Sequence, residues 1–127
     1  MSQSQLRAVL ETSLKLIETG WTKDAYRRQI GDKQHYCAVG AVRRATQIHC
    51  GDDTDAMYTL RMEAFQQLQT QLPNASHWKG RFPSTDPGLP FSLEDNLILY
   101  NDESRDKRRI VNLFKRAISL LDDVNSR

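Results

Sequence analysis

The sequence predicts an all-α fold: a compact single domain over residues 1–127, with about four to five helices and one long loop at about residues 73–91. Apolar side chains recur at helical spacing in four segments of the chain. The alternation of apolar and polar residues that is typical of strands persists nowhere for more than a few residues. A length of 127 residues with 39% hydrophobic residues suits one domain that has its own core.

Composition excludes several classes of protein. The 6 glycines and 4 prolines are ordinary numbers, which excludes collagen-like and wholly disordered chains. No apolar run reaches the ~18 residues that cross a bilayer, and residues 1–5 lack the basic and apolar regions of a signal peptide. Together with only 2 cysteines, this predicts a cytoplasmic, reduced protein without membrane contact. The net charge of +2 is too small to identify a partner.

The first helix is predicted to end just before Gly20, because glycine favours the left-handed conformation found past helix ends. Its buried face consists of Leu6, Val9, Leu10, Leu14 and Ile17. Thr22 is the expected N-cap of a short helix that continues to about Gln29. Residues 30–33 are then expected to form a turn.

The segment from about Tyr36 to His49 is predicted to be the central, most buried helix. Its apolar stripe consists mostly of small side chains, which let neighbouring helices approach closely: Cys37, Ala38, Ala41, Val42, Ala45 and Ile48. Thr54 is the expected N-cap of a third helix over about residues 55–72. The outer face of that helix is rich in glutamine and is expected to be solvated.

The segment between the third helix and Ser92 shows no period, and a loop of this length is uncommon in a compact domain. Its aromatic residues are expected to pin it over the core: Trp78, Phe82 and Phe91. Ser92 is expected to open a short helical turn, and the last helix is predicted from about Ser104 to Val124. The buried stripe of the last helix is Ile110, Phe114, Ala117, Ile118 and Leu121.

Three short motifs stand in order along these elements. They are Gly-Trp at residues 20–21, Tyr-Cys-Ala-Val-Gly-Ala-Val-Arg-Arg-Ala at residues 36–45, and Tyr-Asn-Asp at residues 100–102. The chain thereby resembles a family of small bacterial and phage proteins that form a domain of unknown function, with a Cys-x-x-Gly-Ala-Leu-x-Arg-Ala box and a Trp-Asn-Asp element before a final helix. The resemblance covers about residues 6–118, with Tyr100 in place of the family's Trp. It implies a compact helical domain, often carried on mobile elements, and nothing catalytic.

Cys37 stands at the start of the central helix, where the helix dipole and free N–H groups favour a thiolate. A nucleophilic Cys37 would use His35 or His49 as a base and Asn101 or Asp102 as an orienting group. The alternative, which we favour, is a buried packing residue, because cysteine is often buried as a small hydrophobe. We expect no metal or cofactor, since a zinc site would include adjacent ligands that cannot easily point at one ion: His35, Cys37, His49 and Cys50.

Asn101 and Asp102 are expected to cap the last helix by accepting its free N–H groups. Glu103 would add a favourable negative charge in the first turn. A catalytic role for Asp102 is the alternative hypothesis, and it requires a base or a nucleophile close to this carboxylate.

The last helix carries cations in its N-terminal half, where they oppose the helix dipole. On a helical wheel, five of its basic residues lie opposite the apolar stripe: Arg105, Arg108, Arg109, Lys115 and Arg116. This face is either simply solvated or a docking surface for an acidic protein or for phosphate. Places where local rules fail are candidates for function, so we predict that it binds a partner. Four further residues are candidates to extend it: Arg43, Arg44, Lys79 and Arg81.

These features favour a small non-enzymatic interaction module that binds a host protein and modulates or inhibits it through the basic face. The family's habitat associates such a module with a phage or mobile element, where an anti-defence inhibitor such as an anti-CRISPR protein would fit. A nucleic-acid-binding helical protein is one alternative, in which residues 37–49 and 54–72 would form a helix-turn-helix. The glutamine-rich face of the second helix would then contact the bases, and it lacks the arginines expected there. A Cys37-dependent enzyme is the other alternative.

Overall fold

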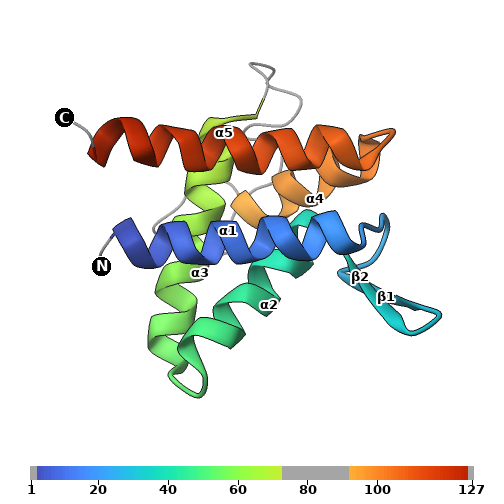
Figure 1. Cartoon of the computed structure of the whole chain (residues 1–127), viewed down its shortest axis with the longest axis horizontal. Helices are drawn as coiled ribbons and strands as arrows, with labels where there is room; N and C mark the ends of the chain where they lie inside the picture. Colours follow the sequence, from blue (N-terminus) through green and yellow to red (C-terminus); the bar gives the residue numbers. More distant parts are fainter. Residues whose placement is uncertain (1–2, 73–91, 126–127) are drawn as a thin grey trace.

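The computed structural model describes residues 3–72 and 92–125 of the chain. These residues form five helices and one two-stranded sheet (Figure 1). The predicted all-α class is therefore confirmed. The helices are α1 (Gln3–Thr19), α2 (Ala38–Cys50), α3 (Thr54–Thr70), α4 (Leu93–Glu103) and α5 (Lys107–Asn125). The strands are β1 (Arg27–Ile30) and β2 (Lys33–Tyr36). The predicted loop at 73–91, with its three aromatic residues, lies outside the described residues.

The helices pack around one core. α1 and α5 lie side by side and run in opposite directions, while α3 crosses behind them (Figure 1). α2 packs against α1, α3 and α4, as expected for a central helix. Each helix buries at least one large side chain in the core, and these include Leu10, Val39, Phe65, Leu97 and Phe114. No helix in the described ranges is long and apolar enough to cross a membrane.

The apolar stripes predicted for α2 and α5 are buried with one exception. The stripe of α5 is buried throughout: Ile110, Phe114, Ala117, Ile118 and Leu121. The small residues of α2 are at most 1% exposed, which lets its neighbours approach closely: Ala38, Ala41, Val42 and Ala45. Ile48 is the exception, because it lies in the last turn of α2 and is 51% exposed.

The short helix predicted from Thr22 to Gln29 is wrong, because this segment leads into a β-hairpin. β1 pairs with β2 in antiparallel register, with Ile30 opposite Lys33. The predicted turn at 30–33 is correct, and Gly31 adopts a φ of 63° at its first central position, as in a type II′ turn. The segment offers no apolar stripe for a helix to bury, and the hairpin residues from Arg27 to Gln34 are all exposed.

Two residues that were predicted to mark helix boundaries, Gly20 and Thr54, do not act as expected. Gly20 does follow α1, but it is not among the described glycines with positive φ. Glycine suits this position because a side chain has little room: a Cβ here would lie 2.9 Å from the ring of His35. The N-cap of α3 is Asp53 rather than Thr54, and its carboxylate accepts the N–H of Ala56 at 3.0 Å. The glutamine-rich face of α3 is also not wholly solvated, because Gln69 is buried.

Candidate functional site

The three sequence motifs meet around the side chain of Asn101 in α4. Its Oδ1 accepts hydrogen bonds from the indole Nε1 of Trp21 at 2.8 Å and from the backbone N–H of Ala38 at 3.0 Å. Its Nδ2 donates to the carbonyl oxygen of Thr22 at 3.1 Å and to Oδ1 of Asp102 at 3.2 Å. All four hydrogen-bonding positions of the amide are used, and the residue is completely buried. One side chain therefore joins segments that are far apart in the sequence.

The prediction that Asn101 and Asp102 cap the last helix is wrong, because α4 continues through both residues to Glu103. Asn101 instead caps α2, since Ala38 is the first residue of that helix. At the start of α5, the side chain of Asp106 accepts the N–H of Arg108 at 2.9 Å. Asn101 thus accepts a helix N–H group, but that group belongs to Ala38, which lies 63 residues earlier in the chain.

Asp102 lies beside this junction and lines a pocket of about 220 Å³. Its Oδ1 accepts the backbone N–H of Asp24 at 2.9 Å. Asp24 has a φ of 64°, a left-handed conformation that is uncommon for a residue other than glycine. The pocket is lined by Asp24, Ala25, Tyr26, Cys37, Ile98 and Asp102. The structure thus brings Asp102 and Cys37 to one pocket, so the chemistry available there depends on the state of the thiol.

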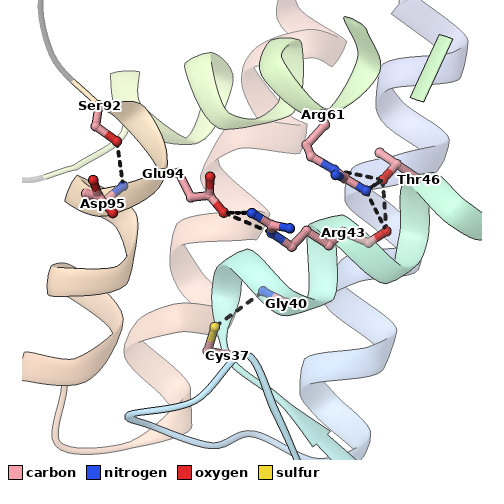
Figure 2. Close-up of polar contacts among 8 residues, drawn as sticks. All are labelled: Cys37, Gly40, Arg43, Thr46, Arg61, Ser92, Glu94 and Asp95. Atoms are coloured by element: carbon pink, nitrogen blue, oxygen red, sulfur yellow. Dashed lines mark hydrogen bonds and ion pairs between the residues drawn. The ribbon is translucent and has the colours of Figure 1, made fainter. Parts of the chain in front are cut away.

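Cys37 is the N-cap of α2 and is only 3% exposed. Its Sγ accepts the backbone N–H of Gly40 at 3.3 Å, which is drawn in Figure 2. Burial raises the pKa of the Cys37 thiol above its ordinary value, against the lowering effect of the N–H groups of Gly40 and Val39. The negative charge of Asp102 raises this pKa further. Burial therefore outweighs the start of the helix, and the neutral thiol is the favoured form at neutral pH.

Within the described residues, neither of the two histidines considered as a base hydrogen-bonds to Cys37. The Nδ1 atom of His35 lies 3.3 Å from the carbonyl oxygen of Trp21. The Nε2 atom of His49 lies 2.9 Å from Oγ1 of Thr12, and His49 belongs to the last turn of α2, at the end opposite Cys37. In the same ranges of the chain, no three side chains of the metal-binding types come together.

The residue three positions after Cys37 is glycine, and the backbone of the loop before β1 lies against α2 at this point. A Cβ on Gly40 would lie 1.9 Å from the carbonyl oxygen of Tyr26. That same carbonyl accepts the N–H of Cys37 at 3.1 Å. The Cys-x-x-Gly spacing in this chain therefore corresponds to the close approach of one backbone segment to another.

Arg43 connects α2 to α4 and to the hairpin. Its guanidinium forms an ion pair with Glu94, with the Nε–Oε1 distance at 2.8 Å (Figure 2). It also lies 4.8 Å from the centroid of the Tyr26 ring. Behind it, Arg61 of α3 donates to Oγ1 of Thr46 at 3.2 Å and to the carbonyl oxygen of Arg43 at 3.4 Å. Burial, followed by the charge of Arg43, lowers the pKa of the Arg61 guanidinium below its ordinary value.

Four of the five residues of the predicted basic face lie on α5, whereas Arg105 lies in the bend before it, because the last helix begins at Lys107 and not at Ser104 as predicted. Four residues of this face are exposed, namely Arg105, Arg108, Lys115 and Arg116. The fifth, Arg109, is half-buried. The guanidinium of Arg109 lies 4.4 Å from the ring centroid of Tyr100, and Arg116 donates to the carbonyl oxygen of Gln71 at 3.2 Å. Among the described residues, no acidic side chain forms an ion pair with Arg105, Arg108 or Lys115. Lys79 and Arg81, which were predicted to extend this face, lie outside the described residues.

Arg43 and Arg44 line a different surface, a cleft of about 190 Å³ between α2 and the hairpin. Its lining consists of Tyr26, Arg27, Tyr36, Gly40, Arg43, Arg44 and Gln47, with no residue from α5. Arg27 was missed from the sequence because its segment was predicted as a helix. Four residues of β1 are too short a run for strand alternation to be recognised.

Comparison with known proteins identifies a family and no characterised relative. The model of a family of unknown function, DUF6197, matches residues 1–120. No curated protein and no solved structure matches the chain.

Proposed function

The chain belongs to the DUF6197 family of unknown function, and from its own surface we propose that it is a small interaction module that binds an acidic protein through the basic face of α5. The basic face consists of Arg105, Arg108, Arg109, Lys115 and Arg116. The observation that carries the proposal is that Arg105, Arg108 and Lys115 have no ion-pair partner within the described residues. Unneutralised charges on one face steer an oppositely charged partner and select it.

Acidic residues offset part of the positive charge at the N-terminal end of the basic face. Glu103 and Asp106 share a small pocket with Arg105 and Arg109 and offset part of the charge there. Between Arg108 and Arg116 the helix rises about 12 Å, which places these cations within reach of one acidic surface patch.

Two of the arginines are held in position before any partner arrives. Arg109 stacks on Tyr100, and Arg116 hydrogen-bonds to the backbone of Gln71. Side chains that are already ordered lose less conformational entropy on binding, which favours affinity. Leu120 at the end of the same outer side is 38% exposed and offers an apolar contact to a protein partner.

The helix-turn-helix alternative has weaker support. Its reader would be α3, and the one basic residue of that helix is Arg61. The guanidinium of Arg61 is turned to Thr46 and to the carbonyl of Arg43 rather than outward. A reader helix of this kind has no arginine available for base edges or phosphates.

We extend the proposal to the biological setting: a cytoplasmic, phage- or mobile-element-encoded protein that inhibits or modulates a host protein, as an anti-defence or anti-CRISPR inhibitor does. Small size and the family resemblance of the sequence support this step. The geometry of the α5 face supports only the binding of an acidic surface.

A pull-down from cell lysate tests the proposal with two charge-matched variants. The triple variant Arg105→Glu, Arg108→Glu, Lys115→Glu reverses the three cations without an ion-pair partner. The control Lys15→Glu, Arg28→Glu, Lys33→Glu reverses three exposed cations elsewhere. An acidic protein that binds the parent and the control but not the α5 variant, and that is released by salt, supports the proposal. Equal binding of all three proteins contradicts it, and recovery of nucleic acid in place of protein favours the alternative.

A further inference from the structure

We propose that the cleft between α2 and the hairpin is a phosphate-binding site, separate from the α5 face, that takes a phosphate joined to a flat ring. A nucleotide and single-stranded nucleic acid both carry this chemistry. The site is built from β1, β2 and α2 and does not depend on the partner proposed for α5.

The charge of the cleft matches a phosphate. Three arginines line it, namely Arg27, Arg43 and Arg44, and Glu94 neutralises Arg43. Within the described residues, Arg27 and Arg44 have no ion-pair partner and both are exposed. The two remaining positive charges equal the charge of a phosphate monoester above its second pKa of about 6.

The side-chain types of the cleft also suit the oxygens of a phosphate. All the cations that line the cleft are arginines. One planar guanidinium group can bind two phosphate oxygens at once. The uncharged residues Tyr36 and Gln47 also line the cleft. Arg43 is held between Glu94 and Tyr26, so part of the site is already in place without a ligand.

Tyr26 provides a surface for the ring of the ligand. The residue is 47% exposed, and its backbone is held against α2 where Gly40 leaves room for it. Aromatic side chains of this kind stack on nucleic-acid bases. A volume of about 190 Å³ is below the range of about 300–1,000 Å³ that encloses a whole small ligand, so the phosphate end fits inside and the ring lies outside on Tyr26.

The hairpin supplies a matched control for Arg27. Arg28 follows Arg27 in β1, is also exposed, and does not line the cleft. Neighbouring residues of a strand point to opposite faces, so the two positions differ in direction rather than in charge. A substitution at Arg28 therefore measures the effect of losing one positive charge from the hairpin.

The test uses four probes on the full chain: AMP, inorganic phosphate, a fluorescein-labelled dT12 strand and a twelve-residue polyglutamate peptide. The double variant Arg27→Ala, Arg44→Ala should weaken the binding of AMP and dT12 by about tenfold or more, because charge-assisted contacts are lost. Arg28→Ala should change both by less than about threefold, as expected for a diffuse charge effect. The salt slope for dT12 should fall by about 0.7 in the double variant, since the contact with one phosphate is removed.

Tyr26→Leu tests the ring subsite separately. It should weaken AMP binding and leave the binding of inorganic phosphate unchanged, because only AMP carries a base to stack. Similar affinity for AMP and dT12 identifies a free nucleotide as the ligand, whereas much tighter binding of dT12 identifies a nucleic-acid strand.

Three results overturn the proposal. One is the absence of binding to every phosphate probe. Another is a polyglutamate peptide that competes as well as dT12, which would assign the cleft to an acidic protein segment. The third is a loss of affinity in Arg28→Ala as large as that in the double variant Arg27→Ala, Arg44→Ala. The variant Arg105→Glu, Arg108→Glu, Lys115→Glu should still bind AMP, so this site and the α5 face can fail independently.

Discussion

Asn101 in α4 accepts the backbone N–H of Ala38 at 3.0 Å, so a residue late in the chain caps the central helix. The same amide binds Trp21 and Thr22 in the loop after α1. The Gly-Trp, Cys-x-x-Gly and Asn-Asp motifs thus form one structural unit, although they are widely separated in the sequence. Because every polar position of Asn101 is used inside the protein, this unit acts first as a connection between helices.

The same substitution at two buried asparagines of α4 should have opposite effects. Asn101→Leu leaves three polar groups without partners, on Trp21, Ala38 and Thr22, and should lower the free energy of unfolding by about 3–5 kcal/mol. Within the described residues, neither amide atom of Asn96 has a hydrogen-bond partner, so Asn96→Leu should be neutral or stabilising by about 1 kcal/mol. Urea unfolding followed by circular dichroism measures both, and an equal loss at the two positions would contradict this account.

Gly40→Ala should be strongly destabilising, although alanine is the better helix former by about 1 kcal/mol. The new Cβ would lie 1.9 Å from the Tyr26 carbonyl oxygen, which is backbone and cannot rotate away. We expect a loss of about 3 kcal/mol or more in the free energy of unfolding. Gly20→Ala is the control, because the ring of His35 that it meets at 2.9 Å can move. Thermal melts should therefore show a clearly smaller loss for Gly20→Ala, and the reverse order would count against the packing described.

Cys37 should react slowly with iodoacetamide in the folded protein at pH 8, and more slowly than the half-buried Cys50. Cys37→Ala should cost about 1 kcal/mol through the lost cap and a small cavity, whereas Cys37→Ser keeps an acceptor for the Gly40 N–H. Rapid labelling of native Cys37 that spares Cys50 would instead support the enzyme hypothesis.

The raised pKa of Cys37 also predicts a pH dependence of stability. The unfolded thiol ionises near its ordinary pKa of about 8.5, while the buried thiol of the folded chain keeps its proton to higher pH. The contribution of Cys37 to stability is therefore complete below about pH 8 and is lost as the pH rises through the raised folded-state pKa. Denaturant unfolding at pH 7 and pH 10 should show a smaller loss in Cys37→Ala than in the parent, and equal losses would exclude this linkage.

Two neighbouring arginines of the basic face should differ in their effect on stability. Arg108→Ala removes an exposed cation without an ion-pair partner in the described residues and should change the free energy of unfolding by less than about 0.5 kcal/mol. Arg109→Ala removes the cation that stacks on Tyr100 and should cost about 0.5–1 kcal/mol. If thermal melts rank the two variants in the opposite order, the stacking contact does not stabilise the fold.

Local sequence patterns were enough to predict most helices and their buried faces. In α5 the spacing of Ile110, Phe114 and Leu121 repeats at helical period, and all three residues are buried. The same holds for the small residues of α2. The turn at Gly31 was also predicted, because a positive φ at such a position selects glycine locally. Burial and turn geometry depend on neighbours within a few residues, so a single sequence records them.

Only the tertiary structure decided how the polar residues are used. The hairpin was missed because its strands are short and exposed, and because β2 is tied to the end of α1 by the bonds of Tyr36 with Gly20 and Thr22. Three of the four hydrogen-bond partners of Asn101 lie 63 to 80 residues away from it along the chain. The same distance in sequence hid the pairing of Arg43 with Glu94, and with it the cleft beside Arg27. A periodic pattern shows that a face is buried, but a hydrogen bond depends on the one atom that the folded chain places opposite.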